Sequence, residues 1–217
     1  MAHQGHYREA HPLIFVFTHW INLVCMIGLA FTGFYIHYPF FAGFMYGARV
    51  IHFTLMFILI INLTSRVILA FWVKDANQLG SRETDIDPKN WLPQKENEHQ
   101  FLETVKYYIF MRNTHVISAK YGALQKISYL ATVPLTFFMA YTGFAIYTPA
   151  QQWAIWPFFA WGVSLFGGDI GIRIAHYFGM WVILLFTMLH AYLAAIDGFK
   201  PLWGLIFLWR ETPGDEH

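Results

Sequence analysis

The sequence has a single cysteine and few charged residues. Because Cys25 is the only cysteine among 217 residues, the chain cannot form an internal disulfide, ligate an iron–sulfur cluster with its own thiolates, or attach haem through a C-x-x-C-H motif. Charged residues make up 12% of the chain, about half the share of a soluble domain. The net charge of +1 gives no basis for expecting a nucleic-acid partner. Any redox group must therefore be held without thiolate.

Hydrophobic residues are abundant instead, at 57% of the chain with a mean hydropathy of +0.40. Four apolar segments are each long enough to cross the roughly 30 Å hydrocarbon core of a lipid bilayer as a helix. They cover about residues 13–38, 49–73, 121–147 and 170–196, and a long polar segment covers 74–120. We predict one all-α membrane domain over residues 1–217, a four-transmembrane-helix bundle.

The basic residues predict how the bundle is oriented. Because the number of spans is even, both termini and the 74–120 segment lie on the same side of the membrane. Twelve of the fourteen Lys and Arg residues belong to that side, and only Arg49 and Arg173 lie on the other. By the positive-inside rule, the termini and the 74–120 segment are expected in the cytoplasm, with the chain in the cell inner (plasma) membrane.

Four histidines lie within the apolar segments. His19 is near the cytoplasmic end of the first span and His52 is near the outer end of the second. The fourth span has His176 near its outer end and His190, 14 residues later, near its inner end. On an α-helix that separation is ~3.9 turns and ~21 Å, so both imidazoles point to nearly the same face. Depth therefore pairs His19 with His190 and His52 with His176.

Two histidine pairs at two depths are what two stacked, bis-histidine b-type haems require, because each iron takes one axial nitrogen from each of two facing helices. Arg49 and Arg173 precede the outer histidines by three residues and share their helix faces. We expect them to neutralise haem propionates, with Arg66 in that role at the inner level. Zinc is disfavoured, since no carboxylate or thiolate joins the histidines in the spans.

The two halves of the sequence repeat each other. Residues 30–34 (AFTGF) recur as 140–144 (AYTGF), and residues 47–52 (GARVIH) recur as 171–176 (GIRIAH). The second offset aligns Arg66 with His190, as expected for a duplicated helix pair that has lost one ligand position. Because internal repeats are frequent in membrane proteins, a transporter stays an alternative that rests on the repeat alone. In another alternative, the histidines only bond helices together and the chain is a haem-free structural anchor.

Several motifs occur together in this chain: His19-Trp20, Thr32-Gly33, the Arg-x-x-His of Arg49–His52, and the His-x13-His of His176–His190. The combination resembles the di-haem cytochrome b subunit of membrane-bound respiratory [NiFe] hydrogenases, in the cytochrome b561 and formate dehydrogenase γ-like family. The resemblance covers nearly the whole chain. Within the 74–120 segment, Trp91-Leu92-Pro93 and Tyr107-Tyr108 are similar to the hydrogenase branch. Anchors of formate dehydrogenase or of thiosulfate/polysulfide reductase remain alternatives.

The resemblance implies that the four histidines ligate two haem b groups. It also implies two partners, a hydrogenase large subunit and an iron–sulfur small subunit, which oxidise hydrogen on the periplasmic side. Electrons would then pass through this chain to menaquinone or ubiquinone. The chain would thus be an electron-transfer subunit of a hydrogen:quinone oxidoreductase, without catalytic residues for hydrogen oxidation.

The resemblance further implies a quinone site near the start of the third span. The family pattern there is Tyr-Asn-x-x-Gln-Lys, and this chain has Tyr121, Gly122, Gln125 and Lys126, with Gly122 in place of the asparagine. Gln125, Lys126 and the nearby His115 are the polar candidates for holding quinone or delivering protons. In the alternative interpretation, they cap a helix and meet lipid headgroups.

Overall fold

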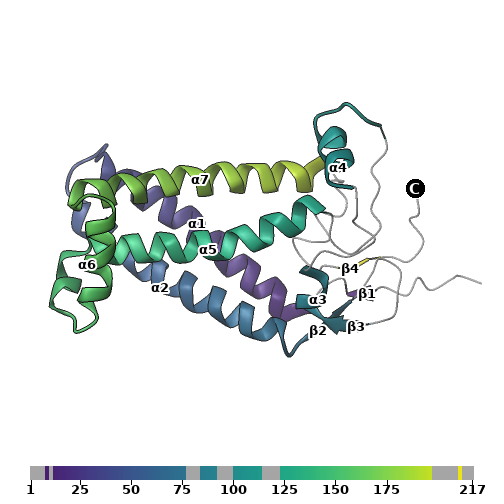
Figure 1. The fold of residues 1–217 in the computed structure, drawn as a ribbon, viewed down its shortest axis with the longest axis horizontal. Helices are drawn as coiled ribbons and strands as arrows, with labels where there is room; N and C mark the ends of the chain where they lie inside the picture. The colour runs from purple at the N-terminus through teal and green to yellow at the C-terminus, as the bar shows by residue number, and fades with distance from the viewer. Residues whose placement is uncertain are drawn as a thin grey trace, which may run out of the picture. The chain divides into compact units, whose positions relative to one another are not determined.

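The structure is a computed structural model that describes residues 8–9, 12–76, 84–91, 100–113, 123–196 and 210–211. Its long helices are α1 (Leu13–His37), α2 (Met45–Ala70), α5 (Ala123–Ile146) and α7 (Asp169–Ile196) (Figure 1). Its shorter elements are β1 (Arg8–Glu9), β2 (Lys74–Ala76), β3 (Thr84–Ile86), α3 (Asp87–Trp91), α4 (Gln100–Tyr108), the 3-10 helix η2 (Thr148–Gln152), α6 (Trp156–Leu165) and β4 (Arg210–Glu211).

The four long helices are each long and apolar enough to cross a membrane, which confirms the predicted all-α membrane fold. Helices suit this role because their backbone N–H and C=O groups are all paired within the segment. The helix ends differ slightly from the expected spans. For example, α2 begins at Met45 rather than at residue 49. Gly43, with a φ of +87°, makes the turn two residues before α2 begins.

The chain divides into two compact units. The first unit contains residues 1–21, 63–130 and 189–217, and the second contains residues 22–62 and 131–188. Each of the four long helices contributes residues to both units.

In the second unit, α6 packs against α5 and α7 through aromatic and aliphatic side chains. Ala145, Phe159 and Ile172 form a buried core there. The hydroxyl of Tyr141 donates a 2.7 Å hydrogen bond to the carbonyl of Phe158. A Cβ on Gly162 would lie 2.3 Å from the Tyr141 hydroxyl oxygen, so only glycine permits this approach of α6 to α5.

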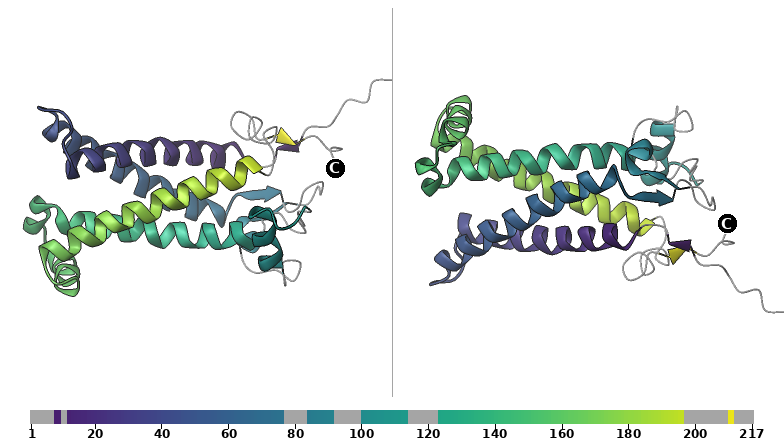
Figure 2. Two further views of the ribbon diagram at one scale, coloured as in Figure 1. Left: turned by 90° about the horizontal axis from the view of Figure 1, so that it is seen from above. Right: turned by 90° about the horizontal axis from the view of Figure 1, so that it is seen from below.

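The first unit contains the short strands. β2 and β3 form an antiparallel pair in which Lys74 faces Ile86, and α3 follows β3 directly (Figure 2). β1 and β4 form a second antiparallel pair, in which Arg8 faces Glu211. The β2–β3 pair brings the first residue of α3, Asp87, back to the end of α2.

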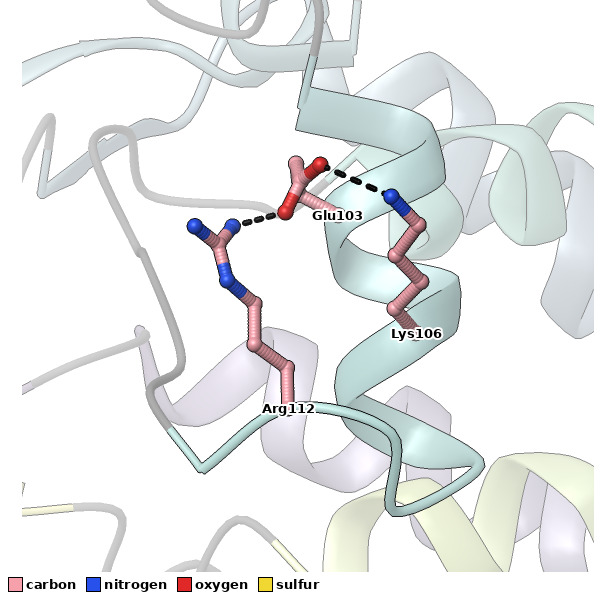
Figure 3. A network of polar contacts seen from close by, with 3 residues as sticks. All are labelled: Glu103, Lys106 and Arg112. Carbon is pink, nitrogen blue, oxygen red and sulfur yellow. Dashed lines mark hydrogen bonds and ion pairs between the residues drawn. The ribbon is translucent and has the colours of Figure 1, made fainter.

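A charge cluster and one hydrogen bond to α7 hold α4 in the first unit. Glu103 lies between Lys106, at 3.3 Å, and Arg112, which follows the helix (Figure 3). These side chains are partly exposed, so each pair contributes little to stability. The hydroxyl of Tyr192 on α7 donates a 3.3 Å hydrogen bond to the carbonyl of Tyr108. The end of α4 is thereby joined to the α7 turn that contains His190.

A hydrogen bond between two asparagines joins α1 to α2 within the second unit. The Asn62 amide nitrogen donates to the Asn22 amide oxygen at 2.6 Å, and Asn62 is buried. In a membrane span, such side-chain hydrogen bonds hold helices together because lipid offers no alternative partner.

We predict that a double-mutant cycle of Asn22→Ala and Asn62→Ala yields a favourable coupling energy of about 0.6 kcal/mol, and at most about 1.7 kcal/mol. The measurement is reversible unfolding in mixed detergent micelles, followed by circular dichroism for the wild type, both single variants and the double variant. A coupling energy of zero would mean that the hydrogen bond does not stabilise the helix pair.

Candidate functional site

The two outer histidines come together in the second unit. His52 is on α2 and His176 is on α7, and their ring centroids lie 6.5 Å apart with an angle of 65° between the ring planes. Both side chains are half-buried. Each histidine lies seven residues after the first residue of its helix, so both are near the N-terminal ends of their helices.

A threonine on a neighbouring helix contacts each of these rings. Thr32 Oγ1 lies 2.8 Å from His52 Nδ1, and Thr142 Oγ1 lies 2.8 Å from His176 Nδ1. Both threonines are buried, at 2% and 0% exposure. The first helix of each half thus contacts the histidine on the second helix of the same half.

The hydroxyl protons determine which imidazole nitrogen is protonated. Thr32 donates its single proton to the carbonyl of Gly28 at 2.7 Å, and Thr142 donates to the carbonyl of Phe138 at 2.9 Å. Since a hydroxyl has one proton, each threonine oxygen accepts the Nδ1–H of its histidine. Each neutral imidazole then has its Nε2 lone pair free for a metal, as is usual for metal-ligating histidines.

Glycines that follow the threonines leave room beside the rings. A Cβ on Gly33 would lie 3.5 Å from His52 Cε1 and 3.5 Å from Met180 Sδ. A Cβ on Gly143 would lie 3.3 Å from His176 Cε1. Any branched side chain at either position would therefore press on the ring. The Thr-Gly step thus combines a hydrogen bond to the ring with space beside it.

The two inner histidines come together in the first unit. His19 on α1 and His190 on α7 have ring centroids 6.4 Å apart, with an angle of 47° between the ring planes. Trp20 packs edge-on against His19, with ring centroids 6.2 Å apart. His19 and His190 are more exposed than the outer pair.

The ring separations test whether each pair fits a haem iron. A metal–imidazole bond is about 2.0–2.1 Å and a ring centroid lies roughly 1.1 Å beyond its nitrogen, so two imidazoles on one iron have centroids about 6.3 Å apart. Two imidazoles in a direct hydrogen bond have centroids roughly 5.1 Å apart. The observed 6.4 and 6.5 Å match the metal-bridged value. Both pairs therefore fit haem, and neither is placed for the two rings to bond each other.

The three expected propionate partners have different surroundings. Arg49 and Arg173 are exposed on the helices that contain the outer histidines. Arg66 is half-buried, and its Nη2 contacts the Asp87 carboxylate, which is fully buried. Arg66 Nη1 is also buried and has no hydrogen-bond acceptor among the described residues. A propionate oxygen is the kind of acceptor that this nitrogen lacks.

Most of the expected quinone site lies outside the described residues. This applies to His115, Tyr121 and Gly122, and Gln125 is described only as part of the α5 backbone. Lys126, in the first turn of α5, is buried at 5% exposure. A buried lysine at the end of a membrane span is unusual and is suited to contacting a polar ligand or a proton path.

Sequence reasoning missed three features of these sites. The threonine–histidine hydrogen bonds were not predicted, although the repeat places Thr142 as the counterpart of Thr32. Met56 and Met180 each follow a histidine by four residues and approach the glycine of the opposite half, which the second repeat offset could have indicated. No signal in the sequence indicates that Asp87 pairs with Arg66.

Comparisons with known proteins show which family this chain belongs to. The family model described as "Prokaryotic cytochrome b561" matches residues 10–206. A "Probable Ni/Fe-hydrogenase B-type cytochrome subunit" of Rhizobium leguminosarum bv. viciae is 32% identical over 81% of this chain and 75% of its own length. The subunit of that name from Cupriavidus necator is 29% identical over 81% and 74%. The "Probable Ni/Fe-hydrogenase 1 B-type cytochrome subunit" of Escherichia coli strain K12 is 27% identical over 81% and 77%.

We predict that Thr32→Val and Thr142→Val each lower the affinity of the outer histidine pair for haem by about tenfold. Loss of a hydrogen bond to a metal-ligating histidine typically lowers affinity by at least that factor. The measurement is haem content per chain during transfer to apomyoglobin. Thr32→Ser, which keeps the hydroxyl, should behave as the wild type. Thr54→Val, at an exposed position of α2, is the matched control, and an equal loss there would contradict the prediction.

Proposed function

Because this chain belongs to the prokaryotic cytochrome b561 family, we propose that it is a two-haem membrane cytochrome that carries electrons from a periplasmic [NiFe] hydrogenase to membrane quinone. The observation that supports this most directly is the separation of the two histidine pairs, 6.4 and 6.5 Å between ring centroids. The proposed partners of this chain are a hydrogenase large subunit and an iron–sulfur small subunit. The relatives' names favour this partner over formate dehydrogenase or thiosulfate/polysulfide reductase.

The chain's own residues have distinct roles in this proposal. His52 and His176 ligate one haem b, and His19 and His190 ligate the other. Thr32 and Thr142 fix the tautomer and orientation of the outer ligands. Haem b, when bound, supplies reversible one-electron chemistry at iron, whose potential the protein tunes through ligands, hydrogen bonds and burial. The apolar helices around the ligands exclude water.

The proposed orientation places the outer pair toward the periplasm and the inner pair toward the cytoplasm. Twelve of fourteen basic residues support it, since they lie on the side of the termini and of the 74–120 segment. The membrane is then the cell inner membrane. We treat residues 1–217 as one cytochrome domain, because each of the four long helices contributes to both compact units.

A quinone site at the cytoplasmic end of α5 completes the proposal. Its residues are Tyr121, Gly122, Gln125 and Lys126, together with His115. The burial of Lys126 in the first turn of α5 supports this location, because ionisable residues buried at membrane depth commonly mark ligand sites or proton paths. Menaquinone or ubiquinone would take its protons from the cytoplasm at this end.

The proposed function predicts the haem content of the chain. A reduced-minus-oxidised spectrum with pyridine-haemochrome quantitation should give two b haems per chain. Alanine at His52 or His176 should remove one haem, and alanine at His19 or His190 should remove the other, because a single axial nitrogen does not hold haem b firmly. Alanine at His37, an exposed residue at the end of α1, is the matched control. Haem-free protein would instead support a structural anchor.

The proposed function also predicts the path of the electrons. In membrane vesicles that contain the complete complex, hydrogen should reduce the b haems and a quinone analogue should reoxidise them. Lys126→Met should weaken quinone binding roughly tenfold, the effect of losing one hydrogen bond to a polar ligand, and leave reduction by hydrogen unchanged. Lys89→Met, at an exposed lysine, is the control. Reduction by formate but not by hydrogen would contradict the hydrogenase assignment.

A further inference from the structure

The guanidinium of Arg66 is enclosed on several sides in the first unit. Its central carbon lies 3.6 Å from the centroid of the Phe15 ring on α1 and 5.6 Å from that of the Trp91 ring on α3. Its Nη2 contacts Asp87 Oδ2, and Asp87 has no exposed surface. A carboxylate from outside the membrane spans is thus buried against a cation at the end of α2.

Arg66 contacts the part of α1 that contains one of the inner histidines. Phe15, on which the guanidinium stacks, precedes His19 by four residues and therefore shares its face of α1. Arg66 also follows His52 by 14 residues, the same spacing that separates His176 from His190. It therefore lies on the ligand face of α2, at the helix position that corresponds to His190 on α7.

The hydrogen bonds of the Arg66 guanidinium are not all satisfied by the described residues. Asp87 occupies Nη2 of the guanidinium, whereas the buried Nη1 has no acceptor among the described residues. An unsatisfied buried donor is costly, and for a charged group the cost is larger. The planar guanidinium of Arg66 therefore has one nitrogen in contact with Asp87 and a second that can still donate to an anion.

We propose that Asp87 is a positioning residue for Arg66, and that its buried negative charge holds the midpoint potential of the inner haem below the value that an uncompensated Arg66 would impose. This inference rests on the proposed function, in that it requires a haem at His19 and His190. The pair is electrically neutral. Without Asp87, a full positive charge would remain beside the inner ligands.

The direction of the effect follows from the change in charge on reduction, which adds an electron and lowers the positive charge of the haem iron by one unit. A nearby positive charge disfavours the oxidised, more positive form and so raises the midpoint potential. The interaction is strong only where water is excluded, since charges in bulk water are screened within about 10 Å at 0.1 M salt. Asp87 meets that condition because it is fully buried.

Asp85 provides a matched control. It is two residues from Asp87 and its side chain is 32% exposed. Lys89 donates a 2.8 Å hydrogen bond to Asp85 and lowers the pKa of this carboxyl, so that it is ionised at neutral pH. Asp85→Asn and Asp87→Asn therefore remove the same charge, one at the surface and one in the interior.

The test is a potentiometric titration of both b haems in the purified, haem-loaded protein, for the wild type, Asp87→Asn, Asp85→Asn and Asp87→Glu. We expect Asp87→Asn to shift the inner midpoint to a higher potential and leave the outer midpoint unchanged. Asp85→Asn removes only a surface charge, and Asp87→Glu keeps the buried charge. Both variants should leave both midpoints at wild-type values. Loss of the inner haem from Asp87→Asn, with retention in Asp87→Glu, would also support the proposal.

Several results would overturn the inference. These are unchanged midpoints in Asp87→Asn, an equal shift in Asp85→Asn, or loss of the inner haem from both Asp87 variants, which would indicate a role in packing alone. The inference and the proposed function fail in distinguishable ways. A wild-type chain with fewer than two haems contradicts the proposed function, whereas two haems with midpoints insensitive to Asp87 contradict only this inference.

Discussion

The hydrogen bond between each outer histidine and a threonine is the interaction on which the arrangement of the second unit depends. An imidazole in an apolar interior needs a partner for its N–H, and a metal needs the other nitrogen without a proton. Thr32 and Thr142 satisfy the first need, while their own protons go to carbonyls of their helices. Each half of the repeat therefore uses its first helix to orient the histidine on its second helix.

The inner level departs from this symmetry. There α1 contributes His19 and α7 contributes His190, whereas α2 has Arg66 where the repeat would place a histidine. A cation inside a membrane span is costly unless it is paired. Asp87 provides that pairing from a segment outside the spans, because the β2–β3 pair brings the start of α3 to the end of α2. The position at which the repeat lacks a histidine thus coincides with a buried ion pair.

Helix packing around the two sites depends on small and polar residues at a few positions. Gly33 and Gly143 leave space beside the outer rings, and Gly162 lets α6 approach Tyr141. The hydrogen bond between Asn22 and Asn62 ties α1 to α2 within the second unit. In an apolar solvent, close approach and internal hydrogen bonds replace much of the hydrophobic force that packs helices in water.

The sequence by itself determined the four spans and the helix that each histidine occupies, because span length and helical period are local properties of a chain. It also predicted which histidines share a depth, and the structure brings the same residues together. Haem ligation by them stays a prediction. Only the tertiary structure decided that threonines contact the outer rings, that Met56 and Met180 approach the opposite glycines, and that Asp87 meets Arg66. Those contacts depend on how each helix is rotated about its axis and on the path of the connecting segment, and no periodicity in the sequence encodes either.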